Sequence, residues 1–361
     1  MKGPFSSLGP ELASANLEAL HKAVLAEAER QIQDFQQGVL AWQGNPYHRP
    51  LADPPVLWAE GTTRLLDYGG TGRLGAVLLI PSLVNRAYIL DLAPGRSLAR
   101  YLAGAGHRVF LIDWDTPGER ERDFGLSDYI AGRLERALRV CARAHGSKLA
   151  LVGYCMGGLL ALALAQRRAE AVSRLALLAA PWDFHAGKAE QAQLLASLKP
   201  ALEPLLEALG EMPLDMLQAL FAALDPDLAL RKFRAFAHLA QDSPEAQAFV
   251  SLEDWANDGV PLTKKVAQET LFGWYGDNRP FKGRWEIAGR AVKPQEIACP
   301  VLVAVPGQDR IVPPASARAV FSQLPRARQL EVAAGHIGMM VSKGAEEKLY
   351  RPLSDWLHAS W

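Results

Sequence analysis

The stretch that most constrains the fold is residues 149–160, where an apolar run meets a cysteine between glycines and then small, apolar residues. Gly153 and Gly157 lie two residues before and two residues after Cys155. This spacing is typical of a strand that turns sharply into a helix, because side chains at the glycines would clash. Such a turn exposes the sulfur at a helix N-terminus, which favours a thiolate. We therefore predict a nucleophilic Cys155 rather than a buried, inert one.

Apolar runs recur on both sides of this turn and alternate with helical patterns. The runs that we expect to be buried strands are residues 76–81, 109–114, 149–154, 175–179 and 301–305, with a further strand at 329–332. Residues 56–59 and 63–68 predict a hairpin before them. Because most runs are apolar on both faces, the pattern indicates an α/β fold, with a mostly parallel sheet covered by helices on both faces.

Two segments outside this alternation predict additional helical parts. Residues 11–42 have apolar residues every three or four positions, as in a long amphipathic helix whose apolar stripe packs on the core or meets a partner. Residues 183–289 show helical patterns broken by prolines and almost no strand signal. We therefore expect three parts, namely an N-terminal helical extension at 1–50, a core at 51–182 and 290–361, and an inserted helical cap at 183–289.

Charge and cysteine content argue against several classes of function. The 39 Lys and Arg residues balance 39 Asp and Glu residues, so no overall field favours nucleic acid or an anionic membrane. Three cysteines, Cys141, Cys155 and Cys299, form no disulfide framework in a chain of 361 residues. No apolar run approaches the roughly 20 residues of a membrane span. We expect a cytoplasmic protein without a nucleic-acid partner or a membrane span.

Two further residues with catalytic chemistry follow the last two expected strands. Asp309 comes soon after residues 301–305, and His336 soon after residues 329–332. The chain order nucleophile, acid, histidine is that of the α/β-hydrolase fold and differs from the chymotrypsin and subtilisin orders. We therefore predict an α/β-hydrolase fold with the triad Cys155, Asp309 and His336. The other seven histidines are interpreted as surface or packing residues.

Backbone N–H groups should bind the oxyanion that forms when this nucleophile attacks an acyl group. The N–H of Met156 is one expected donor, and that of Leu83 or Val84, after the first buried strand, is the other. The histidines and cysteines show no zinc-ligand spacing, and the sequence contains no glycine-rich nucleotide loop. The sequence therefore predicts neither a metal nor a cofactor.

The hexapeptide GYCMGG at residues 153–158 resembles the G-x-C-x-G-G box of polyhydroxyalkanoate synthases. The resemblance runs from about residue 55 to the C-terminus and is closest to the short synthases that work with a partner subunit. The other matching segments are 81–92, 109–114, 128–130, 307–314, 335–338 and 341–342. Residues 277–283 depart from the family, because Pro280 replaces the usual leucine.

This resemblance implies an acyltransferase that polymerises 3-hydroxyacyl-CoA into polyhydroxyalkanoate through a cysteine-bound thioester. Cys155 would carry the growing acyl chain, His336 would deprotonate the thiol, and Asp309 would serve the hydroxyl of the incoming monomer. The acyl group stays activated, because attack on acyl-CoA exchanges one thioester for another. The expected partners are the CoA thioester, the growing polyester and either a second copy or a partner subunit, at polyester granules in the cytoplasm.

Two other functions stay open at this point. A cysteine hydrolase (a thioesterase, a polyester hydrolase or a dienelactone hydrolase) would use the same triad with water, although dienelactone hydrolases are much shorter and lack a cap. A non-catalytic granule-associated protein would use the N-terminal amphipathic helix. The intact triad argues against this second alternative.

Overall fold

The computed structural model describes residues 16–187, 189–223 and 225–359. By their internal contacts these residues form two compact units. The smaller unit combines the described residues up to His48 with Asp225–Ser251, and the larger combines Arg49–Leu224 with Leu252–Trp361. The predicted boundaries of the extension, core and cap stay predictions, since these units divide the chain at other positions.

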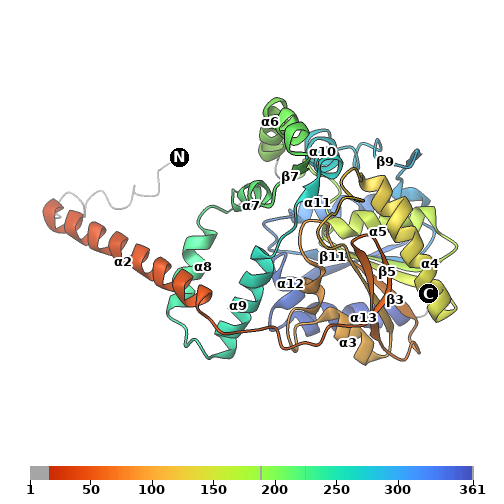
Figure 1. Cartoon of the computed structure of the whole chain (residues 1–361), viewed down its shortest axis with the longest axis horizontal. Coiled ribbons are helices and arrows are strands. Elements are labelled where there is room, and N and C mark those ends of the chain that lie inside the picture. Colours follow the sequence, from red (N-terminus) through yellow and green to blue (C-terminus); the bar gives the residue numbers. More distant parts are fainter. Residues whose placement is uncertain (1–15, 188, 224, 360–361) are drawn as a thin grey trace. The chain divides into compact units, whose positions relative to one another are not determined.

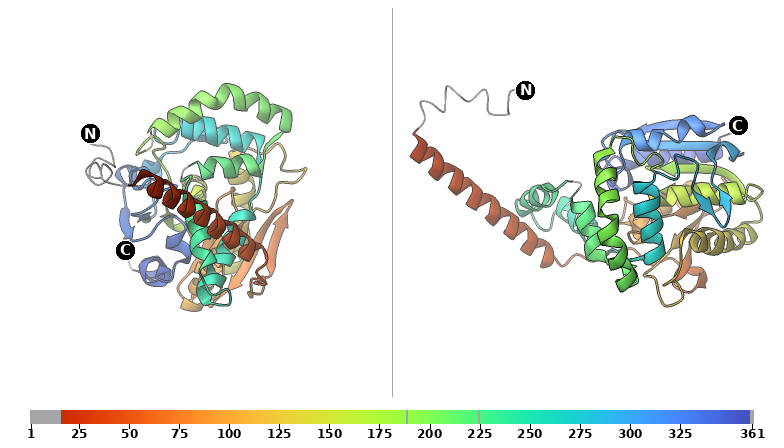
Figure 2. Two further views of the ribbon diagram at one scale, coloured as in Figure 1. Left: turned by 90° about the vertical axis from the view of Figure 1, so that its left-hand side faces the viewer. Right: turned by 90° about the horizontal axis from the view of Figure 1, so that it is seen from above.

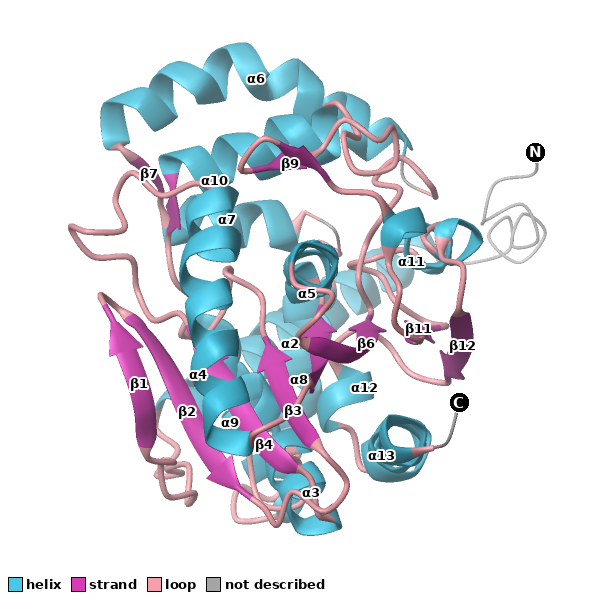
Figure 3. Ribbon diagram, turned by 90° about the vertical axis from the view of Figure 1, so that its right-hand side faces the viewer, coloured by secondary structure: helices cyan, strands magenta, loops and turns pink. Residues whose placement is uncertain are grey.

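The larger unit is built on an eight-stranded sheet with the order β1-β2-β4-β3-β5-β6-β11-β12 (Figures 1 and 3). The strands are β1 (Val56–Glu60), β2 (Thr63–Gly69), β3 (Ala76–Ile80), β4 (Arg108–Asp113), β5 (Leu149–Tyr154), β6 (Val172–Leu178), β11 (Val301–Pro306) and β12 (Ala327–Val332). β2 pairs antiparallel with β1 and β4, and all other neighbours in this sheet pair parallel. The predicted mostly parallel sheet is confirmed.

Helices cover both faces of this sheet because the central strands are apolar on both faces. In β3, Leu78 contributes to the core on one face, together with Leu138 and Leu162. The next residue, Leu79, contributes to the core on the other face, together with Leu102 and Leu353. The helices that supply these partners are α4 (Glu135–His145) and α5 (Met156–Arg167) on the first face, and α3 (Leu98–Ala105) and α13 (Arg351–His358) on the second.

The segment between β6 and β11 is mainly helical, as its sequence pattern predicts. Its elements in the larger unit are α6 (Ala189–Leu209), β7 (Glu211–Met212), α7 (Leu214–Ala222), β8 (Leu262–Thr263), α10 (Lys264–Gln268), η3 (Glu269–Gly276), β9 (Glu286–Ile287), β10 (Arg290–Ala291) and η4 (Pro294–Glu296). The four strands are two residues long each and form two antiparallel pairs. The remaining elements are η1 (Ala87–Asp91), η2 (Asp128–Leu134), α11 (Pro314–Arg318), η5 (Phe321–Gln323), α12 (Gly338–Val341) and η6 (Glu346–Tyr350).

The smaller unit holds the long helix α2 (Leu17–Gln43), α8 (Leu228–Ala237) and the first part of α9 (Pro244–Asn257) (Figure 2). α2 and α8 approach closely at Gly38, where an added Cβ would lie 1.9 Å from the carbonyl oxygen of Phe233. The rings of Phe35 and Trp42 pack on that of Phe233, with centroids 6.0 and 5.7 Å away. Phe35 and Trp42 of the predicted helix are thus packed on α8, whereas Ile32 and Leu40 are 54% and 67% exposed. None of the described helices is long and apolar enough to cross a membrane.

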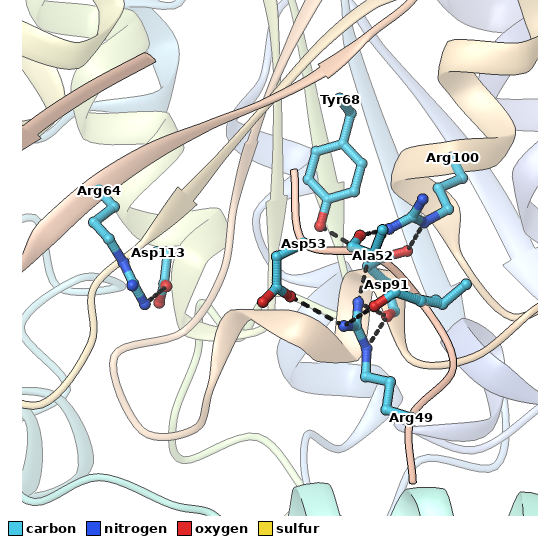
Figure 4. Close-up of polar contacts among 9 residues, drawn as sticks. Arg49, Ala52, Asp53, Arg64, Tyr68, Asp91, Arg100 and Asp113 are labelled. Atoms are coloured by element: carbon cyan, nitrogen blue, oxygen red, sulfur yellow. Dashed lines mark hydrogen bonds and ion pairs between the residues drawn. The ribbon is translucent and has the colours of Figure 1, made fainter. Parts of the chain in front are cut away.

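A buried carboxylate fixes the start of the larger unit to its core (Figure 4). Asp91 is fully buried and accepts hydrogen bonds from Arg49 Nη2 at 2.5 Å, Arg100 Nε at 2.7 Å and the Tyr68 hydroxyl at 3.0 Å. Arg49 Nε also donates to the backbone carbonyl of Asp91 at 3.1 Å. A buried charge is tolerated when it is paired and hydrogen-bonded in this way. The segment before β1, which contains Arg49, is therefore fixed to the end of η1.

Candidate active site

The candidate nucleophile lies in a strained turn between β5 and α5. Cys155 has φ 55° and ψ −128°, outside the regions that residues with side chains prefer. A Cβ at Gly153 would lie 2.4 Å from the carbonyl oxygen of Gly157, and one at Gly157 would lie 2.1 Å from that of Ile80. Both glycines are therefore required by backbone contacts, which hold Cys155 in place at the N-terminus of α5.

The structure brings the predicted acid and histidine together beside this turn. His336 Nδ1 and Asp309 Oδ2 are 2.7 Å apart, and both residues are 7% exposed. The imidazole of His336 is also hydrogen-bonded to the thiol of Cys155. The second oxygen of Asp309 accepts from the backbone N–H groups of Ile311 and Val312, at 2.8 Å each. The backbone thus fixes one oxygen of Asp309, and the other oxygen holds the imidazole. Asp309 therefore orients His336.

The electrostatics of the site favour a charged histidine. Burial acts to lower the pKa of His336, but the charge of Cys155 and the hydrogen bonds that the imidazole donates to Asp309 and Cys155 outweigh it and raise this pKa to about 10. The Tyr154 hydroxyl donates to the backbone carbonyl of His336 at 3.2 Å, and the two ring centroids are 5.2 Å apart. An imidazolium held beside sulfur stabilises a thiolate, which is the nucleophilic form of cysteine.

The other two cysteines lie in environments that keep the thiol neutral. Cys141 is fully buried, and burial raises its pKa. Burial also raises the pKa of Cys299, to about 11. The structure thus shows that the three cysteines lie in different environments, which their number in the sequence does not reveal.

The two expected oxyanion donors in the loop after β3 differ in their hydrogen bonds. The N–H of Val84 already donates to Ser82 Oγ at 3.1 Å. Within the described part of the chain, the N–H of Leu83 has no acceptor. Met156 is the first residue of α5, and its N–H is one of the four that a helix leaves without an intrahelical partner. The N–H groups of Leu83 and Met156 are therefore available to an oxyanion, and their role as donors stays a prediction.

Sequence patterns gave no signal for the contacts that hold this oxyanion loop. Arg86 forms ion pairs with Asp115 and, at 3.1 Å, with Asp258. Trp255 Nε1 donates to the backbone carbonyl of Arg86 at 2.9 Å. These partners lie up to 172 residues away in the chain. Only the folded chain shows that residues 255–258 brace the loop.

The described residues include no cluster of three or more histidine, cysteine, aspartate or glutamate side chains suited to a metal ion. The chemistry that these residues can perform is nucleophilic acyl transfer. A thiolate, a base oriented by a carboxylate and two convergent N–H donors are the parts that this reaction needs.

Comparisons with known proteins agree with this fold. The family model described as alpha/beta hydrolase fold matches residues 75–343. The crystal structure of a monoacylglycerol lipase from Paleococcus ferrophilus aligns with a TM-score of 0.51 at 18% identity, over 82% of this chain and 99% of that one. At this identity the similarity shows the fold alone. The protein is therefore a member of the α/β-hydrolase fold class, as the sequence predicts.

Sequence relatives define the family within this class. A poly(3-hydroxyalkanoate) polymerase subunit PhaC from Synechocystis sp. is 31% identical over 290 residues, which are 78% of this chain and 77% of that protein. The subunit of the same name from Haloarcula marismortui is 30% identical over 286 residues, and the match spans 60% of its length. The chain belongs to the family of poly(3-hydroxyalkanoate) polymerase subunits PhaC. The resemblance drawn from residues 153–158 and the flanking segments is confirmed.

The electrostatic differences among the cysteines predict selective alkylation. Iodoacetamide at pH 7 should modify Cys155 in the folded protein and leave Cys141 and Cys299 unmodified, as measured by peptide mass mapping. His336→Gln should slow the modification of Cys155 about tenfold, because the imidazolium no longer stabilises the thiolate. This difference should be largest near pH 7 and shrink as the pH rises past about 8.5, where a free thiol ionises without help from an imidazolium.

Denatured protein, in which all three cysteines should react, serves as the control for reagent access. Equal rates at Cys155 and Cys299 in the folded protein would contradict the electrostatic account of the site.

Proposed function

We propose that this protein is an acyltransferase that joins 3-hydroxyacyl units from CoA thioesters into a polyester, with the chain carried as a thioester on Cys155. The observation that carries this proposal is the hydrogen-bonded set of Cys155, His336 and Asp309 in a chain of the PhaC family. The cytoplasm, at the surface of polyester granules, is the proposed location.

In the first step the Cys155 sulfur attacks the thioester carbonyl of the CoA substrate. His336 takes the thiol proton, and the oxyanion is bound by the N–H groups of Leu83 and Met156. Collapse of this intermediate breaks the bond to CoA, and His336 returns the proton to the departing CoA sulfur. The product is an acyl thioester on Cys155 and free CoA.

In the second step a hydroxyl oxygen attacks the acyl thioester on Cys155. His336 takes the hydroxyl proton and returns it to the Cys155 sulfur as the ester forms. Asp309 acts on this hydroxyl through His336, because both carboxylate oxygens are already engaged. The conversion of a thioester into an oxygen ester is downhill, so no further source of energy is required. These steps use only side chains and the CoA thioester, and we propose no cofactor.

The product of the reaction tests this function directly. Purified protein is incubated with 3-hydroxybutyryl-CoA, free CoA is measured, and insoluble polyester is separated from free 3-hydroxybutyrate. We expect polyester, and we expect Cys155→Ala to abolish CoA release without unfolding the protein. Release of monomeric hydroxy acid by the wild-type protein would identify a hydrolase instead.

Substitution of His336 and Asp309 should separate the two steps. Asp309→Asn should still release a burst of CoA and accumulate acylated Cys155, because a thiol starts partly ionised and needs little help from an oriented base. Its turnover should fall about 100-fold or more, since the hydroxyl must lose its proton to His336 in the second step. His336→Gln should show neither burst nor turnover. Rapid quench followed by intact-protein mass spectrometry measures both quantities.

If Asp309→Asn acylates as poorly as His336→Gln, the carboxylate is equally necessary in both steps. An ordinary hydrolase triad then describes the site better.

We further propose that the N-terminal half of α2 pairs antiparallel with a second copy of this chain. Leu17, Val24 and Leu25 are between 50% and 69% exposed there. In an antiparallel pair centred between Val24 and Leu25, Lys22 lies level with the partner's Glu27. Apolar side chains and opposite charges then meet along the same stretch of the two helices. Both kinds of contact stabilise helix pairs.

Replacement of the exposed apolar residues tests this pairing. Leu17→Ser with Val24→Ser should convert a dimer into a monomer in sedimentation velocity, because the apolar seam is lost. The matched control, Gln33→Ser with Gln36→Ser on the same helix, should remain dimeric. A wild-type protein that is monomeric at all concentrations would overturn the proposal and favour a different partner subunit or the granule surface.

A further inference from the structure

Tyr275 lies in the active-site region but has no role in the chemistry described above. It is at the end of η3, is half-buried, and packs edge-on against Phe184, with ring centroids 4.9 Å apart. Phe184 follows β6, which pairs with β5, the strand that leads to Cys155. Tyr275 and Cys155 both pack on the same hydrophobic core. The tyrosine therefore reaches the catalytic edge of the sheet from the segment between β6 and β11.

The backbone around Tyr275 is held at two points by the residues that follow β6. His185 Nε2 lies 2.9 Å from the backbone carbonyl of Tyr275 and 3.1 Å from that of Gly276. Asn278 Oδ1 accepts from the N–H of Phe184 at 3.0 Å, and its Nδ2 donates to Asp183 Oδ1 at 2.7 Å. Asn278 is 2% exposed and has φ 54°, so its conformation depends on these contacts. His185 and Asn278 thus fix the position of Tyr275.

The hydroxyl of Tyr275 is a donor without a partner in the described part of the chain, which distinguishes it from the Tyr154 hydroxyl that donates to His336. Burial, together with the negative charges of Cys155 and Asp309, raises the pKa of Tyr275. The phenol therefore stays protonated at any working pH. Tyr275 therefore offers a neutral hydrogen-bond donor at this edge of the sheet.

The order of the strands decides which substrate oxygen this donor can meet. Leu83 follows β3, on one side of Cys155, whereas Phe184 follows β6, on the other side. The acyl carbonyl oxygen is directed towards the N–H groups of Leu83 and Met156. A donor held beside Phe184 is then placed for an oxygen further along the acyl chain, and in a 3-hydroxyacyl group that oxygen is the 3-hydroxyl.

We propose that the Tyr275 hydroxyl donates a hydrogen bond to the 3-hydroxyl oxygen of the acyl unit on Cys155 and so selects 3-hydroxyacyl thioesters over unsubstituted ones. This inference rests on the proposed acyl transfer to Cys155. A polar group that a bound substrate covers discriminates against the analogue that lacks the matching hydroxyl, because the group is then left unpaired.

The test compares acylation by two substrates that differ only in the 3-hydroxyl. Burst release of CoA from 3-hydroxybutyryl-CoA and from butyryl-CoA is measured for wild type and Tyr275→Phe. The variant should lower kcat/KM for 3-hydroxybutyryl-CoA about tenfold, the size expected for one hydrogen bond. It should leave butyryl-CoA acylation within about twofold. Tyr101→Phe, a half-buried tyrosine on α3, should change neither rate.

Each other outcome has a definite meaning. An equal loss with both substrates would overturn the proposal, since Tyr275 would then act on a group that the substrates share or on the fold. No change with either substrate would also overturn it. If wild type is acylated by both substrates but forms no polyester, the polymerase function fails while the discrimination by Tyr275 is still measured. An unchanged melting temperature of Tyr275→Phe shows that the ring still packs on Phe184.

Discussion

The structure of the active site depends on a close backbone contact between α5 and the end of β3. An added Cβ at Gly157 would lie 2.1 Å from the carbonyl oxygen of Ile80, so the helix can lie at this depth only with glycine at that position. The contact brings the N-terminus of α5 beside the loop that follows β3. This contact places the loop of Leu83 beside Met156 and the strained Cys155, as the predicted oxyanion site requires.

Two buried carboxylates in the larger unit show how the surroundings of a carboxylate decide whether its role is structural or reactive. Asp91 is fully buried and paired with two arginines, and this arrangement holds a permanent charge and fixes the chain. Asp309 is paired with a histidine, whose charge depends on a proton, and that histidine is hydrogen-bonded to a thiol. The first site has fixed charges, whereas the second can move a proton between sulfur, nitrogen and a substrate oxygen. Only the second can perform chemistry.

The groups around Cys155 divide between the two sides of β5. The oxyanion donors belong to the side of β3, where Arg86 and its acidic partners brace the loop. On the side of β6, Tyr275 stands among aromatic residues, and the buried Trp274 packs on Trp285 with ring centroids 5.2 Å apart. The mainly apolar surroundings on that side suit an acyl chain. The Tyr275 hydroxyl is the polar donor that we propose for the 3-hydroxyl of this chain.

Local pattern determined the parts of this protein that depend on residues close together in the chain. The apolar runs predict the parallel sheet, the glycines around Cys155 predict the strained turn, and the order of Cys155, Asp309 and His336 places three reactive groups at strand ends. Tertiary structure alone decided which residues meet across long separations, such as Gly38 with Phe233, Arg86 with Asp258, and Phe184 with Tyr275. The reason is that short-range periodicity reports which face of an element is buried, whereas contacts between distant segments depend on how whole elements pack.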